Sequence, residues 1–135
     1  MKPSLQVGNT AEHTVTVTEE MCPAFDGIVV HRVYSTWSMA HHMEIAARLV
    51  LAPHLEEDEE GIGSHLSIDH LGPTPVGHWV RLVAEAVELG PTTLVCDVHA
   101  YHVRESGDKL VGRGKQVQRI LPKEKLRQLI ERAGG

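Results

Sequence analysis

Glu44 is the side chain whose position most suggests acid-base chemistry, because it borders the apolar face of a predicted helix. The segment from Thr36 to Leu51 places methionine, alanine and valine side chains at helical spacing on one contiguous face. Glu44 lies at the border of this face, where partial burial disfavours the charged form of a carboxylate. It is therefore either a functional acid or base, or a surface group that pairs with Arg48 one turn later.

His70 is the second candidate, at the end of a predicted strand over Gly63–His70. Alternation along this strand puts Leu66, Ile68 and His70 on its inner face. An inward histidine at a strand end suits acid-base or orienting work near neutral pH, although a core histidine bonded to backbone is the simpler alternative. Because the only long helix carries Glu44, we expect His70 and Glu44 to face one cavity.

Thr36 is the third candidate, with a hydroxyl at the start of the helix. A threonine in this position is commonly an N-cap, which accepts a hydrogen bond from a backbone N–H. If Thr36 and Glu44 are both helical, the eight residue steps from one to the other correspond to about 12 Å along the axis. They can then meet only if the chain folds back before the helix, or if two subunits contribute to one site.

The rest of the sequence predicts the elements that position these groups. Proline, glycine and scattered apolar residues over 21–34 indicate a loop or lid, and Pro122 opens a short terminal helix. Gly112 and Gly114, inside the last strand, indicate a bulge or a close approach of another segment. We expect five strands: His13–Thr18, Gly63–His70, Trp79–Leu89, Thr92–Arg104 and Lys109–Leu121.

The order of these elements predicts the fold class. One strand, a long apolar helix and four strands joined mainly by hairpins are typical of an α+β protein. We expect a curved antiparallel sheet wrapped around one central helix, in a single domain over residues 1–135. The sheet can cover most faces of so apolar a helix, and a second subunit could cover the rest.

Composition excludes several classes of function. A net charge of −5 without a basic stripe argues against nucleic-acid binding. Cys22 and Cys96 are too few for a disulfide framework and indicate free thiols in a reducing compartment. The N-terminal segment lacks an apolar signal region, and no apolar run approaches the ~18 residues of a membrane span. We therefore expect a cytoplasmic protein without membrane or nucleic-acid partners.

Ten histidines raise the question of a metal site, but their spacing argues against one. His41 and His42 are adjacent and therefore point about 100° apart on a helix. His99 and His102 fall on opposite faces of a predicted strand, and the sequence has neither an HExxH nor a CxxC motif. We expect no metal and no cofactor.

A set of polar and small residues carries a family resemblance in its types, order and spacing. The set is Ser35-Thr36-x7-Glu44 followed by Gly63-x6-His70-x3-Thr74-Pro75-x-Gly77. It resembles the fluoroacetyl-CoA thioesterase-like branch of the hot-dog fold over nearly the whole chain. The resemblance implies a homodimer joined edge to edge, with the active site near the dimer interface. It also implies that Thr36, Glu44 and His70 are catalytic and that Gly63 lines the acyl pocket.

The activity implied by this resemblance is hydrolysis of a short-chain acyl-CoA thioester. Glu44 would either attack the carbonyl, giving a transient mixed anhydride, or serve as general base for water. Thr36 would orient Glu44 or the carbonyl, and His70 would position the carboxylate or water and shuttle a proton. The loop Ala24–Val30 holds a single aromatic residue, whereas the fluoroacetyl-specific type carries an aromatic-rich lid. This difference argues against fluoroacetyl-CoA as the natural substrate.

Two other functions fit a hot-dog fold. A hydratase of this fold normally uses an aspartate and a histidine five residues apart, whereas Asp69 and His70 are adjacent and point to opposite faces. A non-catalytic module that binds acyl-CoA or another small ligand would keep the pocket but leave Glu44 and His70 unable to approach each other.

Overall fold

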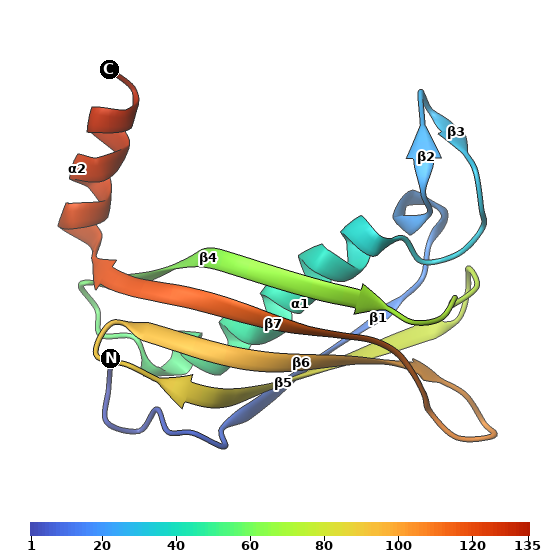
Figure 1. Ribbon diagram of the computed structural model, residues 1–135, viewed down its shortest axis with the longest axis horizontal. Coiled ribbons are helices and arrows are strands. Elements are labelled where there is room, and N and C mark those ends of the chain that lie inside the picture. Colours follow the sequence, from blue (N-terminus) through green and yellow to red (C-terminus); the bar gives the residue numbers. More distant parts are fainter.

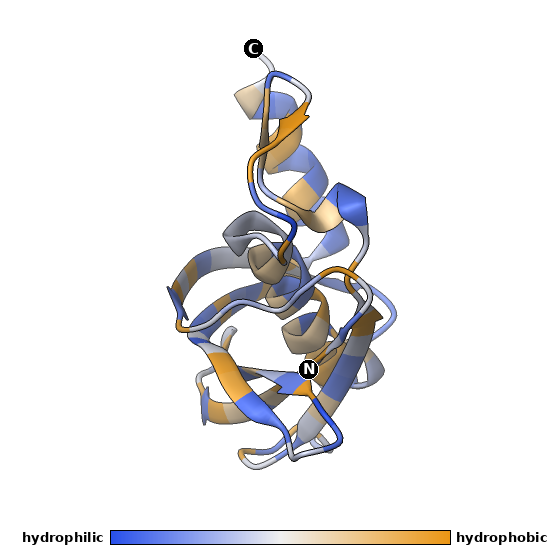
Figure 2. Ribbon diagram, turned by 90° about the vertical axis from the view of Figure 1, so that its right-hand side faces the viewer, coloured by the Kyte–Doolittle hydropathy of each residue, from blue (hydrophilic) through white to orange (hydrophobic).

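An antiparallel sheet curls around one long helix in the computed structural model, which describes all 135 residues (Figures 1 and 2). The helix α1 spans Thr36–Leu51, and a second helix, α2, spans Lys123–Ala133 at the C-terminal end. The spatial order of the strands is β1-β5-β6-β7-β4, which leaves β1 and β4 at the edges. The five strands are β1 (Thr10–Thr16), β4 (Glu59–His70), β5 (Trp79–Leu89), β6 (Thr93–Val103) and β7 (Lys109–Pro122). This architecture confirms the predicted α+β class.

The helix α1 forms where the sequence predicts it. The hydroxyl of Ser35 caps its first turn by accepting a hydrogen bond from the backbone N–H of Ser38 at 3.1 Å. A short 3₁₀ turn that contains Pro53 follows Leu51 and ends the helix. The predicted apolar face is buried against the sheet: Met39, Met43, Ala46, Ala47 and Val50. Ser35, rather than Thr36, is therefore the N-cap.

Two glycines let the helix and a neighbouring strand approach β7 closely. A Cβ atom added to Gly112 would lie 2.4 Å from the sulfur of Met39. A Cβ atom added to Gly114 would lie 2.2 Å from the backbone oxygen of Ser67 in β4 and 3.0 Å from the sulfur of Met43. The close approach predicted for these glycines is confirmed.

Two predicted strands have boundaries that differ from the observed ones by two or more residues. The first strand covers Thr10–Thr16 rather than 13–18, because its pairing with β5 begins at Thr10 and Glu85. The strand that ends at His70 begins at Glu59, four residues earlier than predicted, because Glu59 pairs with Pro122 on β7. Its alternation is as predicted from 65 onward, but a bulge between Gly63 and His65 resets the register before that point.

The predicted loop over 21–34 contains a small hairpin. Its strands are β2 (Ala24–Phe25) and β3 (Ile28–Val29), and it projects away from the sheet (Figure 1). Helix α2 projects in the same direction at the opposite end of the edge strand β4 (Figure 1). The hairpin carries exposed apolar side chains at Phe25 and Ile28. No helix of this fold is both long and apolar enough to cross a lipid bilayer.

Candidate active site

The structure brings Thr36 and His70 into direct contact. Thr36 is the first residue of α1, and because Ser35 caps the helix, the Thr36 hydroxyl is free to face the sheet. Its Oγ1 atom lies 2.8 Å from Nδ1 of His70, the last residue of β4. A hydroxyl and an imidazole at this distance form a pair that can pass or hold a proton.

The surroundings of His70 favour its neutral form. Burial lowers the pKa of His70 below its ordinary value, and a backbone hydrogen bond with Gly72 only partly opposes this effect. The ring of Tyr34, which is 1% exposed, packs edge-on against His70 with centroids 6.5 Å apart. A neutral imidazole fixed in this way can accept a proton near neutral pH.

A second histidine lies behind this pair. The hydroxyl of Tyr34 is 2.6 Å from Nδ1 of His42, and the two rings are stacked with centroids 5.7 Å apart. Burial, together with the neighbouring His41 and His13, lowers the pKa of His42 to about 4. Burial also raises the pKa of the Tyr34 hydroxyl. Tyr34 therefore donates to a neutral His42.

This arrangement predicts that the protein loses stability in mild acid. Because the pKa of His42 is lowered to about 4 in the folded state, the unfolded chain binds more protons between pH 6.5 and 4. The free energy of unfolding should therefore fall as the pH drops through this window, and His42→Gln should reduce that fall. Urea denaturation at several pH values between 4 and 7 measures this change in the free energy of unfolding. The matched control is His31→Gln at an exposed position, which should leave the slope as in the wild type.

The second half of the candidate site surrounds Glu44. The amide nitrogen Nε2 of Gln116, on β7, donates a hydrogen bond to Oε2 of Glu44 at 2.8 Å. A Cβ atom added to Gly63 would lie 3.0 Å from the same carboxylate oxygen, so glycine leaves the room that the carboxylate occupies. Glu44 is half-buried and opens onto a surface cavity of about 400 Å³, whose lining includes His41, Arg48 and Gly63.

Arg48 does not neutralise Glu44. Its guanidinium pairs with Oε1 of Glu60 at 2.7 Å and donates to the backbone oxygen of Gly61 at 3.2 Å. The alternative interpretation of Glu44 as a surface partner of Arg48 is therefore wrong. The carboxylate keeps one oxygen, Oε1, without a protein hydrogen-bond donor, as a base or nucleophile requires.

Within one chain these two halves lie apart. Both Thr36 and Glu44 belong to α1, which places them about 12 Å apart along its axis. Gly63, beside Glu44, and His70, beside Thr36, are separated by roughly 20 Å along β4. Within one chain, Thr36 therefore lies beside His70, and Glu44 lies beside Gly63. Thr36 is itself part of the helix, so the chain does not fold back before the helix to bring Thr36 to Glu44.

Sequence reasoning missed the glutamine that holds Glu44, and it missed the Tyr34–His42 pair. A signal for the glutamine exists in β7, where Gln116 and Gln118 alternate with outward residues and share the inner face with Ile120. Polar side chains at inward positions require a partner, and these two find one on α1. Which partner each would reach depends on the register of β7 against the helix.

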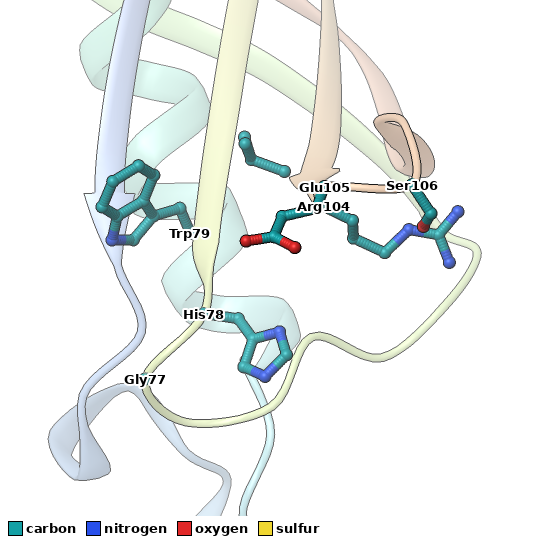
Figure 3. Close-up of a pocket in the computed structure, with 7 residues that line it drawn as sticks. Gly77, His78, Trp79, Arg104, Glu105 and Ser106 are labelled. Atoms are coloured by element: carbon teal, nitrogen blue, oxygen red, sulfur yellow. The ribbon is translucent and has the colours of Figure 1, made fainter.

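A larger cavity, of about 800 Å³, lies elsewhere, where β5 begins and β6 ends (Figure 3). The carboxylate of Glu105 points into the space between Trp79 and His78 (Figure 3). Nδ1 of His78 lies 2.7 Å from Nε2 of the buried His102, and burial followed by the charge of His78 lowers the pKa of His102. None of the predicted site residues lines this cavity.

Comparison with known proteins gives the family. The family model described as FlK: Fluoroacetyl-CoA-specific thioesterase matches residues 17–124. A thioesterase superfamily member from Thermus thermophilus is 39% identical in sequence, with a TM-score of 0.92 over 99% of this chain and 96% of that one. No curated protein sequence matches the chain significantly.

Two more distant structures share the fold. A point mutant of the fluoroacetyl-CoA thioesterase FlK, solved in complex with acetyl-CoA, is 21% identical, with a TM-score of 0.84 over 96% of this chain and 99% of that one. A hot-dog-like protein from Thermanaerovibrio acidaminovorans is 18% identical, with a TM-score of 0.84 over 99% and 94% of the two chains. The predicted hot-dog fold is thus confirmed. The chain belongs to the fluoroacetyl-CoA-specific thioesterase family and is a thioesterase with the hot-dog fold.

Proposed function

We propose that the protein hydrolyses a short-chain acyl-CoA thioester at a site that contains Thr36, Glu44, Gly63 and His70. The observation that carries this proposal is the state of Glu44. Its carboxylate is fixed by Gln116 on one side, left without a cationic partner, and open to a cavity. A surface carboxylate that served only packing would not need a buried amide to hold it.

The roles follow from the two pairs of contacts. Glu44 acts as general base for a water molecule, or as the nucleophile that attacks the thioester carbonyl. His70, kept neutral by burial, takes up or returns a proton, and the Thr36 hydroxyl holds its Nδ1 atom at 2.8 Å. Gly63, whose missing side chain leaves room for the carboxylate, lines the same cavity and would border the acyl group there. The acetyl-CoA complex of the related FlK supports an acyl-CoA as substrate.

Two chains are needed to bring these groups together. Since β4 is an edge strand, it can pair with the same strand of a second chain around a two-fold axis. Antiparallel pairing centred near Leu66 and Ser67 places Gly63 of each chain close to His70 of the other. Glu44 of one chain then meets Thr36 and His70 of its partner, and the dimer holds two complete sites.

The shape of the molecule supports this pairing. The β2–β3 hairpin and α2 project past β4 on the same side and leave the strand between them free (Figure 1). Both projections expose apolar side chains, including Phe25 and Ile28 on the hairpin and Ile130 on α2. A second copy seated along β4 would lie between them and could cover these surfaces.

A thiol-release assay tests the proposed reaction. Acetyl-, propionyl- and longer acyl-CoAs are offered in turn, and free CoA is followed with a thiol reagent. We expect turnover with the short chains and a decline as the acyl group lengthens. Saturable binding without release from any substrate would instead identify a non-catalytic module. Hydration of crotonyl-CoA without thiol release would identify a hydratase.

A further inference from the structure

We propose that Gln116 is a positioning residue for Glu44, a role that rests on the proposed function of Glu44 as base or nucleophile. Gln116 lies on β7 opposite Leu66 and is only 1% exposed. Its Nε2 atom donates to Oε2 of Glu44 at 2.8 Å across the boundary between strand and helix. No other side chain donates a hydrogen bond to this carboxylate.

The orientation of the Gln116 amide is fixed by chemistry. An ionised carboxylate can only accept hydrogen bonds, so the NH₂ group must face Glu44 and the oxygen Oε1 must point away. Gly63 lies beside this contact, because a Cβ atom there would be 3.4 Å from Nε2 of Gln116 and 3.0 Å from Oε2 of Glu44. The Glu44 carboxylate is thus held between the backbone of Gly63 on one side and the buried amide of Gln116 on the other.

The other end of the amide shows that this contact does not exist for stability. Oε1 of Gln116 is buried and has no hydrogen-bond partner. Such an atom destabilises the folded state, and an apolar side chain of the same length would avoid the penalty. Gln118, two residues later, donates its amide N–H to the backbone oxygen of Ala47 at 3.0 Å and has no buried side-chain atom without a partner. The one side-chain hydrogen bond of the buried Gln116 amide is therefore the bond to Glu44.

The unpartnered Oε1 atom of Gln116 could also accept a hydrogen bond from Glu44 in its protonated form. When Glu44 takes a proton from water, it becomes a hydrogen-bond donor. A half-turn of the Gln116 amide then presents Oε1 to the new O–H group. The water oxygen forms a bond to the thioester carbonyl carbon, and the proton on Glu44 passes to the CoA thiolate as the C–S bond breaks. One buried amide can thus hold Glu44 as a carboxylate and as a carboxylic acid.

Within one chain, three charged or titratable side chains lie near this part of the cavity, and in the proposed dimer a second chain adds its His70. His41 and Arg48 come from α1, Glu60 comes from β4, and β7 contributes only uncharged glutamines. Arg48 and Glu60 pair with each other at 2.7 Å. Substitution of Gln116 leaves all of these groups in place, so a change in the pH profile reports on the contact with Glu44.

Two substitutions at position 116 test the assignment. Gln116→Met keeps the length of the side chain and removes both polar atoms. We expect kcat to fall by about 30-fold with KM changed less than threefold, since the substrate pocket is unaltered. The melting temperature should stay the same or rise. Gln116→Glu places a second carboxylate against Glu44, and the acid limb of the kcat profile should move up by about a pH unit or more.

Gln118→Met is the matched control, because it also removes a buried glutamine under α1. It should lower the melting temperature, since the Ala47 oxygen loses its partner, and leave the pH profile where it is. The proposal is overturned if Gln116→Met retains the kcat of the wild type, or loses activity only in proportion to lost stability. Two other results keep the questions separate. Full activity of the variant Glu44→Gln would refute the role of Glu44, and absence of thiol release by the wild type from every acyl-CoA would refute the proposed function.

Discussion

The variant Glu44→Gln is expected to lower kcat for a short-chain acyl-CoA by about a thousandfold. Glutamine has the shape of glutamate but can neither accept the proton of an attacking water nor attack a carbonyl. The fold should remain intact, because the side chain is half-buried and forms no ion pair. Thiol release under saturating substrate measures kcat, and circular dichroism with thermal unfolding verifies the fold.

The control for this prediction is Glu85→Gln, a carboxylate on the exposed face of β5. It changes the net charge by the same amount and should keep kcat within about twofold, because a distant surface charge contributes little. Turnover by Glu44→Gln within tenfold of the wild type would exclude Glu44 as base or nucleophile.

The variant Gly114→Ala is expected to have the largest effect on stability. A Cβ atom at this position would lie 2.2 Å from the backbone oxygen of Ser67, and that oxygen can move only if β4 separates from β7. We expect a loss of roughly 3 kcal/mol in the free energy of unfolding. Urea denaturation should show a lower midpoint with an unchanged slope.

Gly72→Ala provides the comparison. An added Cβ atom there would meet its nearest neighbour, Val111, at 3.6 Å, which is an ordinary van der Waals contact. Its effect on the free energy of unfolding should be below about 1 kcal/mol. Equal midpoints for the two variants would show that β4 and the helix do not require a glycine at 114.

Local patterns were enough to predict most of the fold. The apolar face of α1, the alternation from His65 to His70 and the turn residues between later strands each act within a few residues. The predicted strand boundaries were wrong where pairing with a distant strand sets them, as at Thr10 on β1 and at Glu59 on β4. A strand continues while its partner offers hydrogen bonds, and one sequence segment does not reveal that partner.

The candidate site could be predicted in part. Thr36, Glu44 and His70 were identified from their types and positions, and the structure shows which of them are neighbours within a chain. The contact of Gln116 with Glu44 depends on the register of β7 against α1, which no local pattern specifies. Thr36 and Glu44 lie far apart because one unbroken helix carries both. This distance is the reason why the proposed site needs a second chain.

A mixed dimer tests most directly whether Glu44 works with Thr36 and His70 of the partner chain. Subunits that carry Glu44→Gln are combined with subunits that carry His70→Ala, under separate affinity tags, and the heterodimer is isolated. Each parent homodimer should be inactive. In the heterodimer one site loses both groups and the other keeps both, so we expect about half the kcat of the wild-type dimer. A heterodimer as inactive as its parents would show that Glu44 and His70 act within one chain and would contradict the account.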